Sequence, residues 1–83
     1  MRYSVYILKS KNGSYYIGST NDATERIAYH NSGKVISTKN GRPWKMIYVE
    51  NFDTLSDARK REIQIKKWKS RKAIERLLNG PIV

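Results

Sequence analysis

The feature that most constrains this chain is a pair of tyrosine-bearing segments near its N-terminus, separated by a strong turn signal. The segments are Ser4–Leu8 and Tyr15–Gly18, and Lys11-Asn12-Gly13 lies between them. An Asn-Gly step flanked by apolar runs is the strongest short-range indication of a β-hairpin. The sequence therefore predicts that a strand over Arg2–Lys9 pairs with a second strand over Ser14–Gly18.

The length of the turn decides whether the two phenols of this hairpin share a face. A two-residue loop would place Tyr6 and Tyr16 on opposite faces of the sheet. A three-residue loop with a left-handed glycine would instead pair Ser10 with Ser14. We predict this second register, in which Tyr6 faces Gly18 and both tyrosines project from one face.

Capping signals place a helix after the hairpin. Asn21 or Asp22 can cap its N-terminus, the helix should run to about Asn31, and Gly33 suits its C-terminal stop. The next stretch, 32–43, contains glycine and proline and little periodicity, so we expect a loop there. Its length suggests a binding role.

A third strand and two further helices complete the pattern. Residues 44–52 read as a strand, and the capping box Thr54-x-x-Asp57 opens a helix over 55–68. Ser70 is expected to cap a short final helix that runs through Leu78, and the following Gly-Pro step (Gly80-Pro81) is expected to end it.

The size and charge of the chain limit the function classes. With 83 residues it is long enough for one small domain, which we expect to span residues 1–83. Its 17 Lys and Arg against 7 Asp and Glu give a net charge of +10. This charge favours nucleic acid as the partner, because phosphate neutralisation releases counterions. A basic surface that serves only solubility is the alternative.

The composition also bears on the compartment. Cysteine is absent, which excludes disulfides and thiolate metal sites and fits a cytoplasmic setting. The first apolar stretch, Val5–Leu8, is too short for the core of a signal peptide or for a membrane span. No predicted helix pairs a clean apolar face with a basic one, so we do not expect a membrane partner.

Glu62 is an acidic side chain at an apolar position of the helix predicted over 55–68. At about 100° per residue, it falls within the stripe made by Leu55, Ala58 and Ile65. A carboxylate directed at the core needs a cation or hydrogen bonds. A divalent metal would meet this need, and Mg²⁺ prefers carboxylate oxygen. A salt bridge from Glu62 to an Arg or Lys on the sheet is the alternative.

Arg26 and His30 lie four residues apart on the first predicted helix and therefore share a face. Arginine offers a permanently charged fork that matches phosphate oxygens. His30 is the single histidine and can hydrogen-bond a phosphate or exchange a proton near neutral pH. A capping or surface role is the alternative for a histidine on a helix.

A structural and a functional role are both open for three residues of the hairpin, Tyr6, Tyr16 and Gly18. Strand tyrosines commonly serve as core aromatics, whereas a functional role requires their hydroxyls to point into a cleft. Gly18, placed opposite Tyr6, would leave space for a substrate backbone to approach. The alternative for Gly18 is a plain strand end.

Basic side chains concentrate in the predicted loop and in the run from Arg59 to Lys72. Such side chains can follow a phosphate backbone, although a solvated helix face is the alternative. The residues that we expect to contact DNA are Lys34, Lys39, Arg42, Lys66, Lys67 and Lys69.

Taken in order, these residues resemble the GIY-YIG nuclease domain, and most of all its small stand-alone members. The two family motifs correspond to Ser4-Val5-Tyr6, with Ser and Val where the family name has Gly and Ile, and to Tyr16-Ile17-Gly18. Arg26, His30 and Glu62 are similar to the family's helical arginine, its common histidine and its metal-binding glutamate.

The resemblance implies an α+β fold, within the broad α/β class, in which helices flank a three-stranded antiparallel sheet. It also implies an endonuclease that hydrolyses DNA phosphodiester bonds with Mg²⁺ or Mn²⁺ held by Glu62. Tyr6, Tyr16, Arg26 and His30 would complete the catalytic set. Branched or damaged DNA, in repair or recombination, and a protein partner that supplies specificity both fit this expectation.

Two other functions stay open on the sequence alone. A nuclease-like fold could bind DNA or RNA without cutting it, and the net charge supports that function equally. A scaffold element could dock an acidic protein through the basic helix. The sequence leaves the oligomeric state undetermined.

Overall fold

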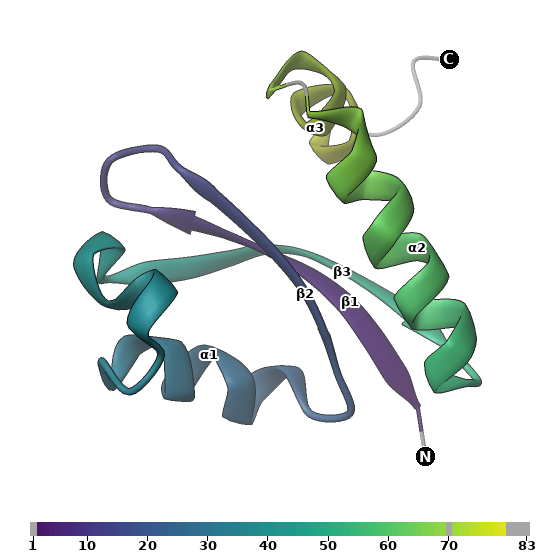
Figure 1. Ribbon diagram of the computed structural model, residues 1–83, viewed down its shortest axis with the longest axis horizontal. Coiled ribbons are helices and arrows are strands. Elements are labelled where there is room, and N and C mark those ends of the chain that lie inside the picture. The colour runs from purple at the N-terminus through teal and green to yellow at the C-terminus, as the bar shows by residue number, and fades with distance from the viewer. Residues whose placement is uncertain (1, 70, 80–83) are drawn as a thin grey trace.

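The computed structural model describes residues 2–69 and 71–79, so the predicted cap at Ser70 and the predicted stop at Gly80-Pro81 lie outside the described residues. Strands and helices follow one another along the chain, and the fold brings the N-terminal hairpin next to the third strand and the helix that follows it (Figure 1). In order, the elements are β1 (Tyr3–Ser10), β2 (Tyr15–Thr20), α1 (Ala23–Asn31), the 3₁₀ helix η1 (Ile36–Gly41), β3 (Trp44–Phe52), α2 (Leu55–Trp68) and α3 (Arg71–Leu78).

The three strands form one antiparallel sheet in the order β2-β1-β3. This arrangement confirms the predicted fold, with β1 as the central strand. The hairpin adopts the predicted three-residue turn: Ser10 N–H donates to Ser14 O over 2.9 Å, and Gly13 has a φ of +86°. Tyr6 therefore pairs with Gly18, as predicted for the register that places both phenols on one face.

Each face of the sheet has its own apolar cluster. On one face Tyr6, Leu8 and Trp44 pack with Ile27 of α1. On the other face, side chains of β1 pack against α2 and α3, and the buried members of this cluster are Val5, Ile7, Ala58, Ile65 and Ile74. The two clusters follow from the alternation of side chains along β1, which is apolar on both sides.

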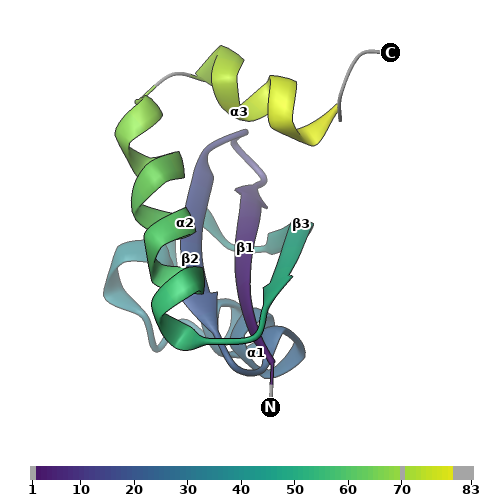
Figure 2. The same ribbon diagram turned by 90° about the vertical axis from the view of Figure 1, so that its right-hand side faces the viewer.

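The helices begin where their capping signals predicted. Asp22 accepts a hydrogen bond from the backbone N–H of Glu25 over 3.0 Å, and Thr54 accepts one from Asp57 over 3.1 Å. Figure 2 shows α3 close to the β1–β2 turn, where the Arg71 guanidinium lies 4.9 Å from the centre of the Tyr15 ring.

Two details differ from the predictions. The stretch 32–43 was expected to be a loop, but η1 forms within it, because Thr38 N–H bonds back to Val35 O over 3.1 Å. Leu55 was placed in the buried stripe of α2 and is instead 38% exposed. It lies at the first position of α2.

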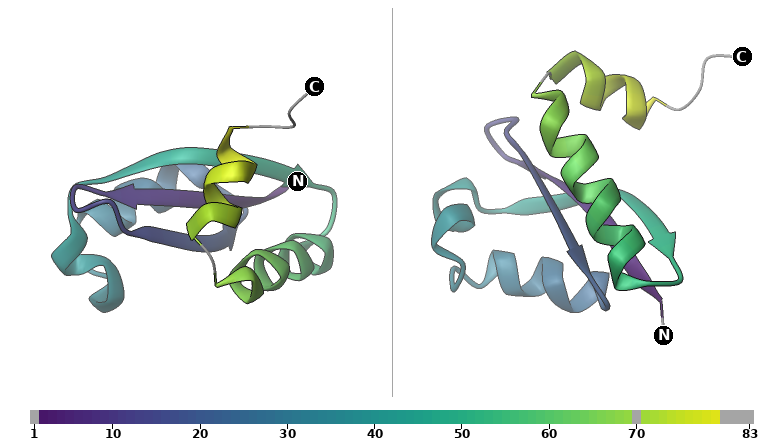
Figure 3. Two further views of the ribbon diagram at one scale, coloured as in Figure 1. Left: turned by 90° about the horizontal axis from the view of Figure 1, so that it is seen from above. Right: turned by 45° about the vertical axis from the view of Figure 1, so that its right-hand side comes forward.

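Strand β2 lies at the edge of the sheet, and the candidate site lies along it. In Figure 1 and in the right panel of Figure 3, β2 runs between α1 and α2. Successive residues of an edge strand point to opposite faces, so β2 can offer side chains to both helices. Within the described residues, no helix has the length and apolar character needed to cross a membrane.

Candidate active site

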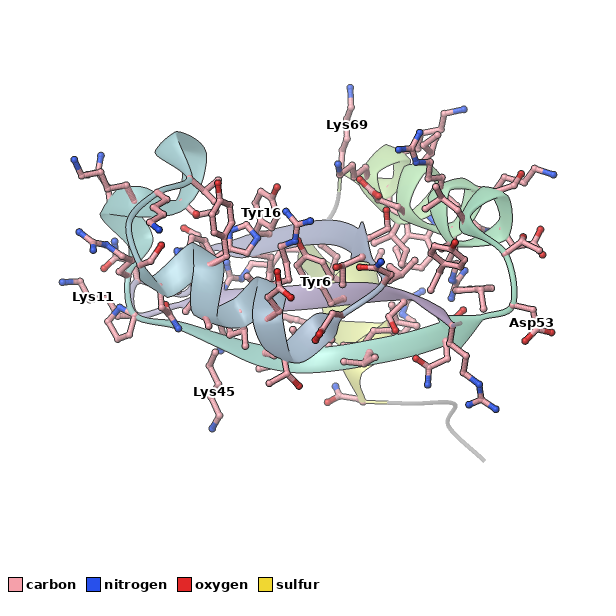
Figure 4. All side chains as sticks on the ribbon, turned by 90° about the horizontal axis from the view of Figure 1, so that it is seen from below. Tyr6, Lys11, Tyr16, Lys45, Asp53 and Lys69 are labelled. Carbon is pink, nitrogen blue, oxygen red and sulfur yellow. The ribbon has the colours of Figure 1, made fainter. Side chains whose placement is uncertain are left out.

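A pocket of about 390 Å³ lies along β2, with walls from β1, α1 and α2. In Figure 4, Tyr6 and Tyr16 lie between α1 and α2. The pocket therefore combines groups from three consecutive elements, β1, β2 and α1, with groups from α2, which is distant in the sequence. Its lining residues are Tyr6, Tyr16, Gly18, Ser19, Arg26, Arg59, Glu62 and Ile63.

Tyr6 projects from the central strand and is 2% exposed. Its hydroxyl lies 3.0 Å from His30 Nε2, and its ring stacks on Tyr16 with 6.3 Å between centroids. Burial raises the pKa of Tyr6 well above its ordinary value, and the neighbouring phenol and Glu62 add to this rise while Arg26 opposes it. Tyr6 is therefore a neutral phenol at physiological pH.

Tyr16 reaches the same pocket from β2. Its ring lies 4.7 Å from the His30 ring and 6.3 Å, edge-on, from the Trp44 ring. These contacts pack the ring between α1 and the start of β3. Its hydroxyl has no hydrogen-bond partner among the described residues, so it is available to water or to a phosphate oxygen.

His30 is only 1% exposed and does not line the pocket. It lies behind the two tyrosines, where Nε2 contacts the Tyr6 hydroxyl and Nδ1 lies 2.9 Å from Thr38 Oγ1. Burial lowers the pKa of His30, and the charge of Arg26 lowers it further, so the ring is neutral near pH 7. The imidazole thus reaches a substrate only through Tyr6, rather than by direct contact with phosphate.

Glu62 approaches the pocket from α2. Ser19 Oγ donates a 2.6 Å hydrogen bond to Glu62 Oε1, and Lys66 Nζ lies 2.6 Å from Oε2. Burial alone would raise the pKa of Glu62. Hydrogen bonds from Lys66 and Ser19, with the charges of Lys66 and Arg59, nevertheless hold it below its usual value.

The sequence left open a salt bridge from Glu62 to an Arg or Lys on the sheet, and the observed salt bridge differs from it. The basic partner is Lys66, one turn along the same helix, and the sheet supplies a hydroxyl rather than a cation. A carboxylate that is ionised and directed at a pocket edge remains able to accept further ligands, because each oxygen has two lone pairs.

Arg26 occupies the α1 wall of the pocket. Its guanidinium lies 5.8 Å from the centre of the Tyr29 ring, and it has no ion pair among the described residues. A second cavity of about 300 Å³, where β2 leads into α1, also has Arg26 in its wall. Arg26 is therefore a cation with free hydrogen-bond donors beside the carboxylate and the phenols.

The donor set of the pocket fits a hard divalent cation held by one carboxylate. Among the described residues, no group of three or more His, Cys, Asp or Glu side chains could hold a metal ion. Glu62 is the acidic residue that lines the pocket, which it shares with the phenols of Tyr6 and Tyr16. Mg²⁺ is commonly bound through one or two carboxylates, with water and phosphate oxygens as its other ligands.

Gly18 contributes to the site in a different way from the one expected. A Cβ at this position would lie 2.5 Å from the Tyr6 hydroxyl oxygen and 2.6 Å from Cζ. The space left by the missing side chain is therefore filled by the Tyr6 phenol and not left open to a substrate backbone. Glycine at this position lets the phenol approach β2 closely.

The six basic residues predicted to contact DNA separate into three groups. Lys66 borders the pocket through its bond to Glu62. Lys39 and Arg42 line another cavity, of about 460 Å³, together with Lys11 of the hairpin turn. The remaining residues line none of these cavities: they are Lys34, Lys67 and Lys69, all exposed.

Three residues of the site were missed in the sequence. Arg59 lines the pocket one turn before Glu62, and its i, i+3 spacing could have revealed it. Ser19 carried no signal, because its contact with Glu62 depends on how α2 docks on β2. Thr38 lies in the stretch expected to be a loop, where no pattern marked it as buried, yet it is fully buried and contacts His30.

The amino-acid sequence matches the family model described as the GIY-YIG catalytic domain over residues 2–75. A UPF0213 protein of Staphylococcus saprophyticus is 40% identical over 80 residues, which cover 95% of this chain and 98% of that protein. A UPF0213 protein of Listeria welshimeri is 48% identical over 63 residues, which cover 75% of this chain and 70% of that protein.

A solved structure is similar throughout its length. The solution NMR structure of a UPF0213 protein from Bacillus halodurans aligns with a TM-score of 0.62 at 36% identity, covering 98% of this chain and 89% of that one. The range matched by the family model includes both tyrosine motifs, the α1 residues and Glu62. On these grounds the chain belongs to the GIY-YIG catalytic-domain family and is similar to its small UPF0213 members.

Proposed function

We propose that this protein is a metal-dependent endonuclease that hydrolyses DNA phosphodiester bonds. The observation that carries the proposal is the single pocket in which an ionised carboxylate, an unpaired guanidinium and two phenols meet. These are the groups that hydrolysis of a phosphodiester needs: a metal ligand, a phosphate-binding cation and a proton acceptor. Membership of a catalytic-domain family supports the same reaction class.

Arg26 is the residue proposed to bind the phosphate. Its guanidinium has no ion pair among the described residues, so its donors are free for the oxygens around phosphorus. Its charge would favour the transition state, in which negative charge accumulates on those oxygens. Arg59, on the opposite wall, is placed to add attraction as the phosphate enters.

The proposed proton path begins at the attacking water. As the water oxygen bonds to phosphorus, its proton passes to Tyr6 Oη, and the proton already on Oη passes to His30 Nε2, 3.0 Å away. The raised pKa of Tyr6 makes a free phenolate unfavourable, so a concerted transfer suits this site better than prior ionisation. The P–O bond to the leaving group breaks, and solvent protonates the leaving oxygen.

Glu62 is proposed to hold the cation, Mg²⁺ or Mn²⁺, whose positive charge would stabilise the leaving oxygen. Ser19 fixes the orientation of the carboxylate through Oε1, and Lys66 keeps it ionised. Tyr16, with its hydroxyl unpaired among the described residues, would orient the water or a phosphate oxygen.

DNA is proposed as the substrate on the basis of charge. The net charge of +10 attracts a polyanion, and a second basic cavity lies by the hairpin turn and η1. We include branched or damaged DNA among the proposed substrates. We also propose that a protein partner supplies sequence or structure specificity, because the domain is small.

The test is nicking of a supercoiled plasmid by the purified protein with Mg²⁺, with Mn²⁺ and with EDTA. We expect metal-dependent conversion to the open circle, abolished in Glu62→Gln, which keeps the shape of the side chain but removes its charge. Thr24→Ala, on the exposed side of α1, is the matched control and should cut normally. Full activity of a folded Glu62→Gln variant would contradict the assignment.

One observation favours a second candidate, a module that binds nucleic acid without cutting it. Both oxygens of Glu62 already accept hydrogen bonds within the protein, so the carboxylate is satisfied without a metal. In that case the protein would bind DNA equally well with EDTA and would nick it under no metal condition. Binding that persists while Mg²⁺-dependent nicking is absent would select this candidate.

A further inference from the structure

Thr38 is a buried polar residue that lies at the end of a chain of hydrogen-bonding groups. It is fully buried, and its Oγ1 lies 2.9 Å from His30 Nδ1, while His30 Nε2 lies 3.0 Å from the Tyr6 hydroxyl. The chain Thr38–His30–Tyr6 therefore runs from the interior, at η1, to the pocket. Of its three members, only Tyr6 lines the pocket.

Two arrangements of protons along this chain are conceivable. In one, His30 carries its proton on Nδ1 and donates it to Thr38 Oγ1, and Nε2 accepts the Tyr6 proton. In the other, Thr38 donates to Nδ1, and Nε2–H donates to the Tyr6 oxygen. Which arrangement is present depends on what else each hydroxyl can bond to, because the neutral imidazole has one donor and one acceptor.

The surroundings favour the first arrangement. The Thr38 hydroxyl has an acceptor of its own, the Val35 carbonyl oxygen, at 3.4 Å. In the second arrangement the Tyr6 proton would have no acceptor among the described residues, since the hydroxyl bonds to none of them other than His30. That proton would be left to a water in the pocket, so the first arrangement satisfies more groups within the protein.

We propose that Thr38 is a positioning residue that fixes His30 in the Nδ1-protonated tautomer, so that Nε2 is ready to receive the Tyr6 proton. This role rests on the proposed nuclease reaction, in which Tyr6 passes its proton to His30 as it takes one from water. In the other tautomer, Nε2 already carries a proton and has no lone pair with which to accept another, so the transfer from Tyr6 is blocked.

The backbone around Thr38 is held by several contacts. Its carbonyl accepts a 2.6 Å hydrogen bond from Trp44 Nε1, and its N–H donates to Val35 O over 3.1 Å. Trp44 is in turn fixed to the end of α1, because Asn31 accepts from the Trp44 N–H over 2.6 Å and donates to its carbonyl over 3.0 Å. The hydroxyl at position 38 is thus held in place by groups outside the pocket.

The tautomer can be measured without any cleavage, because His30 is the only histidine in the chain. Long-range ¹H–¹⁵N correlation NMR of the labelled wild-type protein gives one pair of ring nitrogens. We expect Nδ1 to be protonated and Nε2 unprotonated near pH 7. Protonation on Nε2 instead would overturn the proposal, whatever the enzyme does to DNA.

Variants at position 38 distinguish an effect on the His30 tautomer from an effect on side-chain packing. Thr38→Val has nearly the same shape but no hydroxyl, and Thr38→Ser retains the hydroxyl but lacks the methyl group. We expect Thr38→Val to shift His30 towards Nε2 protonation and to lower kcat for nicking at least about tenfold, with little change in DNA affinity. Thr38→Ser should restore the wild-type tautomer and most of kcat.

Other outcomes would contradict the role. Thr38→Val with the wild-type tautomer would overturn it, even if its activity fell, because the loss would then come from packing. Thr24→Val is the matched control for the exchange of threonine for valine and should change neither the tautomer nor kcat. If wild type has the expected tautomer but cuts no DNA, the proposed function fails while the assignment of Thr38 to His30 stands.

Discussion

Ser19 Oγ donates a 2.6 Å hydrogen bond to Glu62 Oε1, and this contact joins edge strand β2 to helix α2 across the rim of the candidate site. It orients the carboxylate and helps to hold its pKa below the usual value. The bond connects residues that are 43 positions apart, so it exists only when the helix is docked.

Removing this hydrogen bond should weaken both the fold and the site. For Ser19→Ala we expect a loss of about 1 kcal/mol in the free energy of unfolding, since a hydrogen bond to a partly exposed charge is being deleted. The concentration of Mg²⁺ needed for half-maximal nicking should rise. Urea unfolding and a metal titration measure the two effects, with Ser56→Ala on the exposed first turn of α2 as control.

Replacing Arg26 should impair cleavage far more than folding. Arg26→Lys keeps a positive charge but loses the planar fork, and we expect kcat for nicking to fall about 10²-fold while thermal stability barely changes. Lys45→Ala is a suitable control, because Lys45 points away from both tyrosines (Figure 4). A lysine variant that cut at the wild-type rate would show that the fork is unimportant.

Gly18→Ala should displace the Tyr6 phenol. The added Cβ would lie 2.5 Å from the phenol oxygen, which cannot be accommodated without moving the ring. We expect a loss of about 1–3 kcal/mol in the free energy of unfolding and a loss of nicking, because the Tyr6–His30 contact would lengthen. Denaturant unfolding and the plasmid assay measure these effects. Normal activity in this variant would mean that β2 shifts to accommodate the methyl group.

Protein stability should fall as the pH falls through the range in which a free histidine titrates. The folded-state pKa of His30 lies below its ordinary value, so the unfolded chain takes up this proton first. The free energy of unfolding should therefore decrease from about pH 7 downwards, through the unfolded histidine pKa of about 6.5, and level off below the folded pKa.

Thermal unfolding measured at intervals between about pH 7.5 and pH 5 tests this dependence, because carboxylates titrate mostly below that range and contribute little within it. In His30→Gln the dependence should be much flatter, since the titrating group is gone. A wild-type melting temperature that stays constant across the range would argue against a neutral, buried His30.

Basic residues away from the pocket should act through charge alone. Lys11 and Lys39 line the cavity by the hairpin turn and η1, and if each contacts a DNA phosphate, Lys39→Ala should reduce the slope of log Kd against log salt by about 0.9. Lys11→Ala should act similarly. Lys45→Ala serves again as the control, and equal slopes for all three variants would leave this cavity outside the DNA path.

The local signals of the sequence were sufficient for most of the fold. The Asn12-Gly13 turn, the caps at Asp22 and Thr54 and the two-sided apolar pattern of β1 each act within a few residues, and the structure has all of them. The motifs that mark the GIY-YIG family are likewise short, which is why the family was recognisable before any contact was known.

The sequence by itself therefore determined the strands, the α-helices, the hairpin register and the family, because those depend on local backbone preferences and on side-chain alternation. Only the tertiary structure decided that His30 lies behind Tyr6, that Ser19 and Lys66 satisfy Glu62, and that Thr38 reaches the imidazole. Each of these depends on how a helix docks against a strand or on how η1 folds back. Such contacts join residues whose spacing along the chain carries no periodic signal.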